Sequence, residues 1–398
     1  MAPQFEQKDA GTPRPTAQTQ ACDLVSLSRF EKRYGVDINR QGGKFTYKLH
    51  GGSDQDVLDF STSPTMAGLN QAGSILSKRV SDKEIELAAK YHVQFSNDGE
   101  DAQHQQIRNA DGKYVAGKLI QARAPKLNEL TGIEAALNRS RPSQLIDGES
   151  DKGVKFYFLT SKYVSDEKSV AHFDQSDLHQ QPAILVEPER LQEFPLRQSD
   201  AVRQGLSGQK TVETYITHEL VHNGQHNLGW STINTLASQF GWLYSKSGWL
   251  LRGKDETYYA LDEKYPASRP QWYLANESGQ PVDAKQQLLA GGKPTYVTNA
   301  QVRANALVHP LTNYFITPYE MMADELTMFR MGNAQRANIA QADCVQYQLL
   351  KTLDQSEIDQ ASAPEQHYIR DWNGQLVEQN SQTTAAVQKQ EMKFHCGQ

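Results

Sequence analysis

The chain has 398 residues, of which 22% are charged and 38% hydrophobic, and its formal net charge is −6 at pH 7. This length accommodates one large core or two to three domains, and the composition is that of an ordinary soluble globular protein. The slight acidic excess argues against a basic face for nucleic acid, and no apolar run approaches the ~20 residues of a membrane span.

Residues 1–23 are rich in Pro, Gln and Thr, so we expect a disordered leader. They contain no apolar stretch, and no Sec signal peptide is therefore predicted. Three expectations remain for localisation. The protein stays in the cytoplasm, it is exported by a signal-independent route, or a signal was removed upstream of this sequence.

Residues 24–125 are predicted to form a small N-terminal α+β region. A helix followed by strands is expected over 24–50. The stretch 62–74 reads as turn-rich, and SDKE at 81–84 has the pattern of a capping box that opens a short helix before the strand VQF. The similar segments RYGVDIN and KYHVQFS are either a faint duplication or two like helix-to-strand junctions. The polar stretch 97–113 is expected to be an exposed loop or a small hairpin, without a calcium loop.

Residues 126–345 are predicted to form the main domain, of class α+β. A helical pattern starts near residue 126 and is followed by two strands. VKFYFLT at 154–160 has the apolar, aromatic composition of a buried strand. AILVEP at 183–188 is a second strand, which is either an interior strand or an edge strand able to align an extended substrate.

The most informative stretch is THELVH at 217–222. A helix is expected to start near Thr211, and His218 and His222 then lie one turn apart on one flank. Two imidazoles at this spacing can bind one Zn²⁺, and Glu219, rotated by about 100°, can serve as the general base of an H-E-x-x-H hydrolase. The alternative is a solvated helix face that carries two ordinary histidines.

A zinc site needs a third protein ligand. The next histidine, His226, comes too early for the metzincin spacing, so we expect a surface histidine there. In TPYEMMADELTMF at 317–329, Thr317 and Pro318 suit the start of a helix. Glu320 is the predicted zinc ligand and Asp324, one turn later, the carboxylate that holds a ligand histidine. Alternatively, Glu320 closes a capping box with Thr317.

The two motifs together resemble the gluzincin metallopeptidases, and NYFITPYEMMADELTMFR at 313–330 resembles the glutamate helix of the anthrax-lethal-factor-like peptidases. The resemblance covers about residues 126–335. It implies a zincin-like domain with a mixed sheet and an active-site helix. It also implies that Tyr314 donates to the developing oxyanion, although Tyr314 could equally be a core aromatic. His309 is the alternative donor.

The spacing between the two motifs is longer than in that family, and residues 253–294 look like an insertion. The GW pairs that follow the histidine helix are expected to build core or a cleft wall rather than a carbohydrate platform. Residues 346–398 are predicted to be a C-terminal helix and a polar tail. Of the three cysteines, Cys344 and Cys396 are the pair best placed for a disulfide, and free thiols are an equal alternative.

These features predict a zinc-dependent endopeptidase that acts on protein or peptide substrates. Zinc is expected to be held by His218, His222 and Glu320, with Glu219 and Tyr314 as the catalytic residues. A secreted toxin or effector is one biological role that such an activity would suit. Two other functions stay open: a zinc-binding interaction protein without catalysis, and an amide hydrolase that acts on cell-wall peptide.

Overall fold

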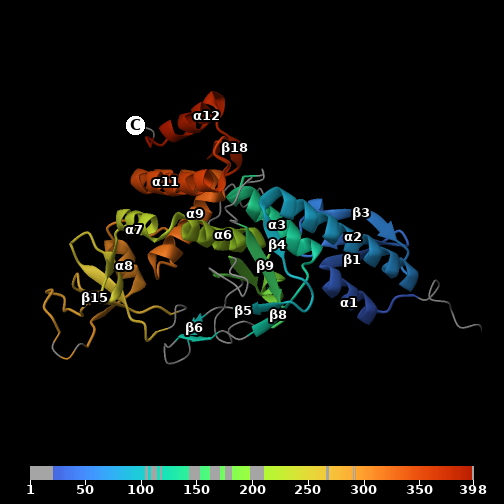
Figure 1. The fold of residues 1–398 in the computed structure, drawn as a ribbon, viewed down its shortest axis with the longest axis horizontal. Coiled ribbons are helices and arrows are strands. Elements are labelled where there is room, and N and C mark those ends of the chain that lie inside the picture. Colours follow the sequence, from blue (N-terminus) through green and yellow to red (C-terminus); the bar gives the residue numbers. More distant parts are fainter. Residues whose placement is uncertain are drawn as a thin grey trace, which may run out of the picture. The chain divides into compact units, whose positions relative to one another are not determined.

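The structure is a computed structural model. It describes residues 21–103, 106–108, 114–116, 119–142, 153–161, 171–174, 182–197, 210–265, 269–289, 291 and 293–396 (Figure 1). The chain divides into two compact units, the first made of Met1–Asp82 with Lys126–Asn128 and the second of Lys83–Pro125 with Glu129–Gln398. The first 20 residues of the expected leader lie outside the described residues.

The first unit combines a helix with a three-stranded antiparallel sheet in the order β1-β2-β3. Its elements are α1 (Leu24–Tyr34), β1 (Val36–Gln41), β2 (Lys44–Leu49), η1 (Asp54–Asp56), β3 (Val57–Thr62) and the first part of α2 (Met66–Tyr91). Phe45, Tyr47 and Leu49 alternate along β2 and are buried, as expected for a strand with one face on a core. The expected helix followed by strands is confirmed here.

The helix α2 differs from the sequence prediction, which placed turns at 62–74 and a helix start at Ser81. The helix begins at Met66 and runs through Ser81 without interruption. Thr65 caps its start by accepting a hydrogen bond from the Gly68 N–H at 3.2 Å. The Ser81 hydroxyl donates to the Ser77 carbonyl within the helix, so it makes an internal bond instead of a cap.

The second unit contains a mixed sheet in the order β10-β11-β9-β8-β5, with β4 also pairing with β9. Its strands are β4 (Val93–Phe95), β5 (Asp101–Gln103), β8 (Leu119–Arg123), β9 (Val154–Leu159), β10 (Ala171–Asp174) and β11 (Ala183–Val186). All residues of β9 and β11 are buried, which confirms both predicted strands. Because β4, β5 and β8 pair within this sheet, the expected domain boundary at residue 125 does not match the division of the fold.

The strand β11 lies inside the sheet, between β10 and β9, so the hypothesis that AILVEP is an edge strand is wrong. Among the described strands, β10 is the edge on this side of the sheet; it runs antiparallel to β11, whereas β11 runs parallel to β9. The polar stretch 97–113 contributes β5 and β6 (Gln106–Arg108), and β6 pairs with β7 (Tyr114–Ala116). The expected small hairpin is therefore present.

The helix α6 contacts α7, α9 and α11 within the second unit, whose helices are seen in Figure 1. They are α3 (Leu127–Ser140), α4 (Pro188–Leu191), α6 (Val212–Leu228), α7 (Trp230–Gln239), α8 (Asn299–Asn305), α9 (Pro318–Arg330), α10 (Asn333–Ala342), α11 (Cys344–Ala361) and α12 (Ser381–Met392). The helices α6, α9 and α11 pack against one another. A Cβ atom at Gly224 of α6 would lie 2.5 Å from Glu357 Cδ of α11, so only glycine permits this approach.

The expected insertion at 253–294 is part of a larger antiparallel sheet in the order β12-β13-β14-β15-β16. These strands are β12 (Trp242–Ser245), β13 (Gly248–Arg252), β14 (Tyr258–Leu261), β15 (Trp272–Ala275) and β16 (Tyr296–Val297). Trp242 and Trp272 are buried in one core cluster with Phe315 and Met322. The segment therefore joins the core next to α9, and its sheet starts earlier than the expected insertion.

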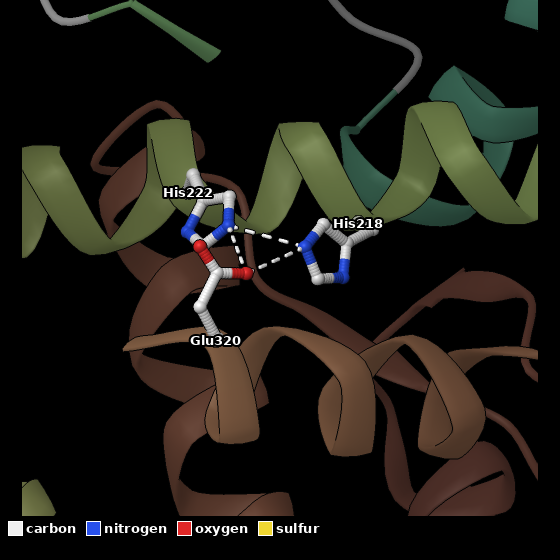
Figure 2. A group of neighbouring side chains, drawn as sticks. All are labelled: His218, His222 and Glu320. Atoms are coloured by element: carbon white, nitrogen blue, oxygen red, sulfur yellow. Dashed lines mark hydrogen bonds and ion pairs between the residues drawn. The ribbon is translucent and has the colours of Figure 1, made fainter. Parts of the chain in front are cut away.

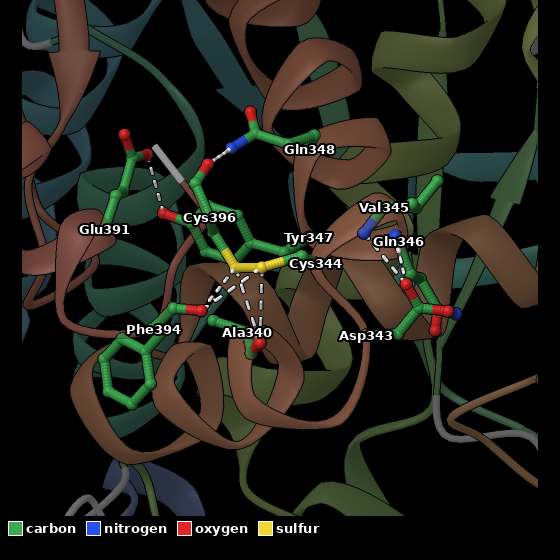
Figure 3. Close-up of a disulfide and its surroundings, with 10 residues drawn as sticks. All are labelled: Ala340, Asp343, Cys344, Val345, Gln346, Tyr347, Gln348, Glu391, Phe394 and Cys396. Atoms are coloured by element: carbon green, nitrogen blue, oxygen red, sulfur yellow. Dashed lines mark hydrogen bonds between the residues drawn. A yellow bond between two sulfur atoms is a disulfide. The ribbon is translucent and has the colours of Figure 1, made fainter. Parts of the chain in front are cut away.

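The end of the chain is more ordered than the polar tail predicted from the sequence. A hairpin of β17 (Tyr368–Arg370) and β18 (Leu376–Glu378) follows α11, and α12 follows the hairpin. A disulfide joins Cys344, at the start of α11, to Cys396 beyond α12 (Figure 3). The pairing predicted as one of two alternatives is present, and Cys22 is a free cysteine.

The disulfide is expected to stabilise the fold by restricting the unfolded chain. It joins residues 52 positions apart, and the chain-entropy relation gives about 4 kcal/mol for a loop of this length. Cys344→Ser with Cys396→Ser should therefore lower the free energy of unfolding by about that amount in urea titrations. Cys22→Ser is the matched control and should leave it nearly unchanged. An equal midpoint for the double variant and the parent would show that the cysteines are not paired.

No helix in the described ranges combines the length and the apolarity that a membrane crossing requires.

Candidate metal centre

The helix α6 forms as the sequence predicted. Thr211 is its N-cap and exchanges hydrogen bonds with Thr214, which satisfies backbone groups at the helix start. Val212, Ile216 and Leu220 are buried along one side. This packing fixes the rotation of the helix about its axis, and His218 and His222 consequently face α9 (Figure 2).

The helix α9 also begins as predicted, with Thr317 as N-cap and Pro318 in the first turn. The Thr317 hydroxyl accepts a hydrogen bond from the Glu320 N–H at 3.2 Å. The Glu320 carboxylate does not return this bond and points instead toward the histidines of α6 (Figure 2). This geometry decides against the capping-box alternative. Met322, Leu326 and Phe329 form the predicted buried face.

His218, His222 and Glu320 are the one group of potential metal ligands that comes together in the described part of the chain. His218 Nε2 lies 3.2 Å from His222 Nε2 and 3.2 Å from Glu320 Oε2, and His222 Nε2 lies 3.4 Å from Glu320 Oε2. Ligands at 2.0–2.2 Å around a tetrahedral ion are about 3.3 Å apart. The three atoms therefore have the spacing of one face of such a tetrahedron.

The outer nitrogen of His218 is held by the residue that the sequence predicted. His218 Nδ1 lies 3.0 Å from Asp324 Oδ1. The second carboxylate oxygen of Asp324 accepts a hydrogen bond from the Thr312 hydroxyl at 2.6 Å. Because Nδ1 is engaged by a carboxylate, Nε2 keeps its lone pair for a cation. Thr312 was not identified from the sequence.

Gln225 holds the second histidine and was also missed by the sequence analysis. Its Oε1 lies 2.9 Å from His222 Nδ1, and its Nε2 donates to the Tyr319 carbonyl at 3.1 Å. Gln225 is buried and lies three residues after His222, on the same flank of α6. That spacing was a usable signal in the sequence. Both imidazoles thus present Nε2 to the same point.

Gln225→Leu is expected to weaken metal binding by about 10- to 100-fold without unfolding the protein. Loss of a group that orients a ligand histidine typically has this effect on metal affinity. The measurement is a competition titration with a chromophoric chelator. Gln239→Leu, the same change at an exposed position of α7, is the control. Identical affinities for Gln225→Leu and the control would mean that His222 needs no such support.

The charges of the three residues suit a cation. Burial disfavours the charged form of His218, but hydrogen bonds to Asp324 and Glu320 outweigh it, so its pKa lies well above the ordinary value. The pKa of His222 is also raised, because Glu320 outweighs burial. Burial acts to raise the pKa of Glu320, yet the two imidazoles hold it far below its usual range. Glu320 is thus ionised, as a metal ligand must be, and a metal ion would have to displace the proton that the raised pKa of each imidazole favours.

Glu219 is buried and lies beside the histidines without belonging to the group of three. Its negative charge favours the charged forms of both His218 and His222, so its carboxylate acts on both rings. The sequence prediction of Glu219 as a base that is not a metal ligand stays a prediction, and this position is compatible with it. His226, in contrast, is exposed as expected, although the helix continues past it to Leu228.

Tyr314 and His309 both lie on the segment before α9. Tyr314 is 39% exposed, so it is not a core aromatic, whereas its neighbour Phe315 is buried and stacks on Trp272 at 5.5 Å. The Tyr314 N–H donates to the Thr312 hydroxyl, which itself donates to Asp324. The backbone of Tyr314 is thereby tied to the metal centre. His309 is also exposed, and its Nδ1 lies 3.1 Å from the Arg303 carbonyl.

The GW pairs divide between core and surface. Trp242 is 3% exposed and belongs to the core, whereas Trp230 is 56% exposed. Trp230 stacks on Tyr319 at 5.9 Å, and Trp249 meets the same Tyr319 ring edge-on at 6.1 Å. Tyr319 precedes the ligand Glu320. The rings of Trp230 and Trp249 therefore form an aromatic cluster around Tyr319, the residue before Glu320.

No protein-family model, no curated protein and no solved structure matches this chain. The case for the site thus depends on its own geometry. The donor set of two imidazoles and one carboxylate fits a divalent transition metal, because the three donor atoms have tetrahedral spacing. In addition, Asp324 and Gln225 orient the two imidazoles through their Nδ1 atoms.

Proposed function

We propose that the protein is a zinc-dependent endopeptidase of the gluzincin type. The observation that carries the proposal is the 3.2–3.4 Å spacing of His218 Nε2, His222 Nε2 and Glu320 Oε2. Two imidazoles and one carboxylate, with a fourth position left to water or substrate, are a ligand set of catalytic zinc sites. A zinc ion in this place would polarise the scissile carbonyl and lower the pKa of a water molecule.

The residues of the chain would divide the work among them. Glu219 accepts the proton of the attacking water and delivers it to the leaving amine. Tyr314 donates a hydrogen bond to the oxyanion that develops on the carbonyl oxygen. Asp324 and Gln225 keep the two imidazoles in one orientation during the reaction.

An extended peptide would align along β10. This strand is the edge of the mixed sheet and packs close to α6, which carries the histidines. An edge strand offers unpaired backbone groups to which a substrate can add as a further strand. The interior position of β11 excludes it from this role, so β10 replaces AILVEP in the proposed mechanism.

The disulfide bears on where this activity takes place. Structural disulfides persist in oxidising compartments and are rare in the cytosol. The Cys344–Cys396 bond therefore favours export over a cytoplasmic location, which agrees with the expectation of a secreted toxin or effector.

The direct test is purification, determination of metal content and incubation with two substrates. About one zinc per chain is expected, because one set of three ligands is described. Cleavage of casein that stops with a chelator and returns with zinc supports the endopeptidase. Cleavage of muropeptides alone would assign the amide-hydrolase alternative, and bound zinc without any turnover would assign the interaction protein.

A further inference from the structure

A cavity of about 620 Å³ lies in the C-terminal part of the second unit. Its walls come from α10, from α11, from the hairpin β17–β18 with the residues on either side of it, and from α12. None of the metal-centre residues lines it. Ligand pockets for small molecules typically measure 300–1,000 Å³, so this cavity has the size of a ligand site.

Most charges around the cavity are paired within the protein. Arg370 donates to both carboxylate oxygens of Asp354, at 2.6 and 2.9 Å. Lys351 lies 2.8 Å from a carboxylate oxygen of Glu391. Glu391 also accepts a hydrogen bond from Tyr347, close to the disulfide (Figure 3). The two ion pairs, Arg370–Asp354 and Lys351–Glu391, are each electrically neutral.

Arg336 differs from the other basic residues of the lining. It is 1% exposed, and no described carboxylate forms an ion pair with it. Its Nη1 donates to the carbonyls of Arg370 and Asp371, whereas its Nε has no hydrogen-bond partner. Burial lowers the pKa of Arg336 more than the surrounding groups raise it.

A buried cation without a paired anion is costly, even when aromatic rings surround it. The Arg336 guanidinium lies 4.1 Å from the Phe329 ring centroid and 5.4 Å from that of Trp372. These rings offset part of the cost. An anion in the adjacent cavity would offset more, because the attraction acts in a medium of low dielectric constant.

Beside four apolar residues, the lining contains side chains that can hydrogen-bond to hydroxyl groups. They are amides, one hydroxyl and one imidazole: Gln355, Gln366, Gln379, Gln388, Thr384 and His367. The remaining acid, Asp359, is exposed and accepts a hydrogen bond from Gln355. We propose that this cavity binds a small hydroxylated molecule that bears one carboxylate or phosphate group, with the anionic group directed toward Arg336.

The proposal is tested by calorimetric titration of the full chain at constant ionic strength. Glucose 6-phosphate and gluconate are the two anionic probes, and they distinguish a phosphate from a carboxylate. Glucose is the neutral control, and inorganic phosphate tests the anion alone. Saturable binding of at least one anionic sugar at one site per chain is expected, with glucose at least tenfold weaker.

Charge changes on the exposed wall separate a site from a general salt effect. Gln388 lines the cavity on α12 and is exposed, so the Gln388→Glu variant should fold normally. Its affinity for the anionic probe should be roughly tenfold weaker than that of the parent. Gln388→Lys should keep or strengthen binding. Gln382→Glu makes the same charge change on α12 outside the cavity and should have no effect.

Arg336→Met removes the charge and keeps an apolar side chain among the rings. The Arg336→Met variant should not bind the anionic probe. If it does not fold, the affinities of the Gln388 variants decide the proposal. The proposal is overturned if neither anionic sugar binds saturably, or if Gln388→Glu binds as tightly as Gln382→Glu. In that case Arg336 serves only to cap the carbonyls of Arg370 and Asp371 inside the core.

Discussion

Glu320→Ala is expected to lose the metal while the protein remains folded. Zinc sites of four ligands contribute about 10–16 kcal/mol of binding free energy, so removal of one ligand should cost about 3 kcal/mol, or at least 10²-fold in affinity. The fold should tolerate the change, because Thr317 caps α9 through the Glu320 backbone N–H and not through its side chain.

The measurement is zinc per chain after dialysis, together with circular dichroism for folding. Asp324→Ala is the graded comparison. It leaves all three ligands and removes the support of His218, so a loss of only 10- to 100-fold is expected. A Glu320→Ala protein that retains zinc with the affinity of the parent would remove Glu320 from the ligand set, and the gluzincin assignment would fail with it.

The candidate site could be predicted from the sequence because its parts are local. The spacing of His218 and His222 follows from the helical period alone, and Thr317 with Pro318 marks the start of α9. The contact between α6 and α9 could only be inferred because the two histidines of one helix and the glutamate of the other complete one set of zinc ligands. The structure shows this meeting through the contacts of Glu320 and Asp324 with His218.

The arrangement of strands could not be predicted in the same way. A buried strand such as β11 has the same apolar composition in the middle of a sheet as next to its edge, and its position depends on its two partners, β10 and the earlier strand β9. The expected boundary at residue 125 also differs from the division of the fold, since β4 and β8 pair with β9 across 30 or more intervening residues. Local patterns do not contain this information.

The C-terminal part was predicted only as a helix and a polar tail, because its core combines apolar side chains with buried ion pairs. Arg330 donates to Asp354 and Glu357, and Arg370 shares Asp354 with it, all within the buried interior. Sequence patterns treat Arg, Asp and Glu as surface residues, because these side chains are rarely buried unless they are paired. The pairing itself joins α9, α11 and β17, and only the structure shows it.

Glu219→Gln is expected to separate metal binding from catalysis. Glu219 is absent from the group of three ligands but acts electrostatically on both histidines. Glutamine keeps the size and hydrogen-bonding atoms of the side chain and cannot accept the proton of the attacking water. The variant should therefore bind zinc as the parent does, and its kcat should fall by ~10²-fold or more, the usual scale for a positioned general base.

Two measurements on the same preparation decide the role of Glu219: zinc per chain and turnover of a peptide that the parent cleaves. Glu277→Gln, the same change at an exposed position outside the site, is the matched control and should match the parent in both. Loss of zinc in Glu219→Gln would make the residue a ligand or a support of the site. Unchanged turnover with zinc retained would show that the chemistry does not take place at His218 and His222, because a hydrolase of this type is slowed by ~10²-fold or more when its base is lost.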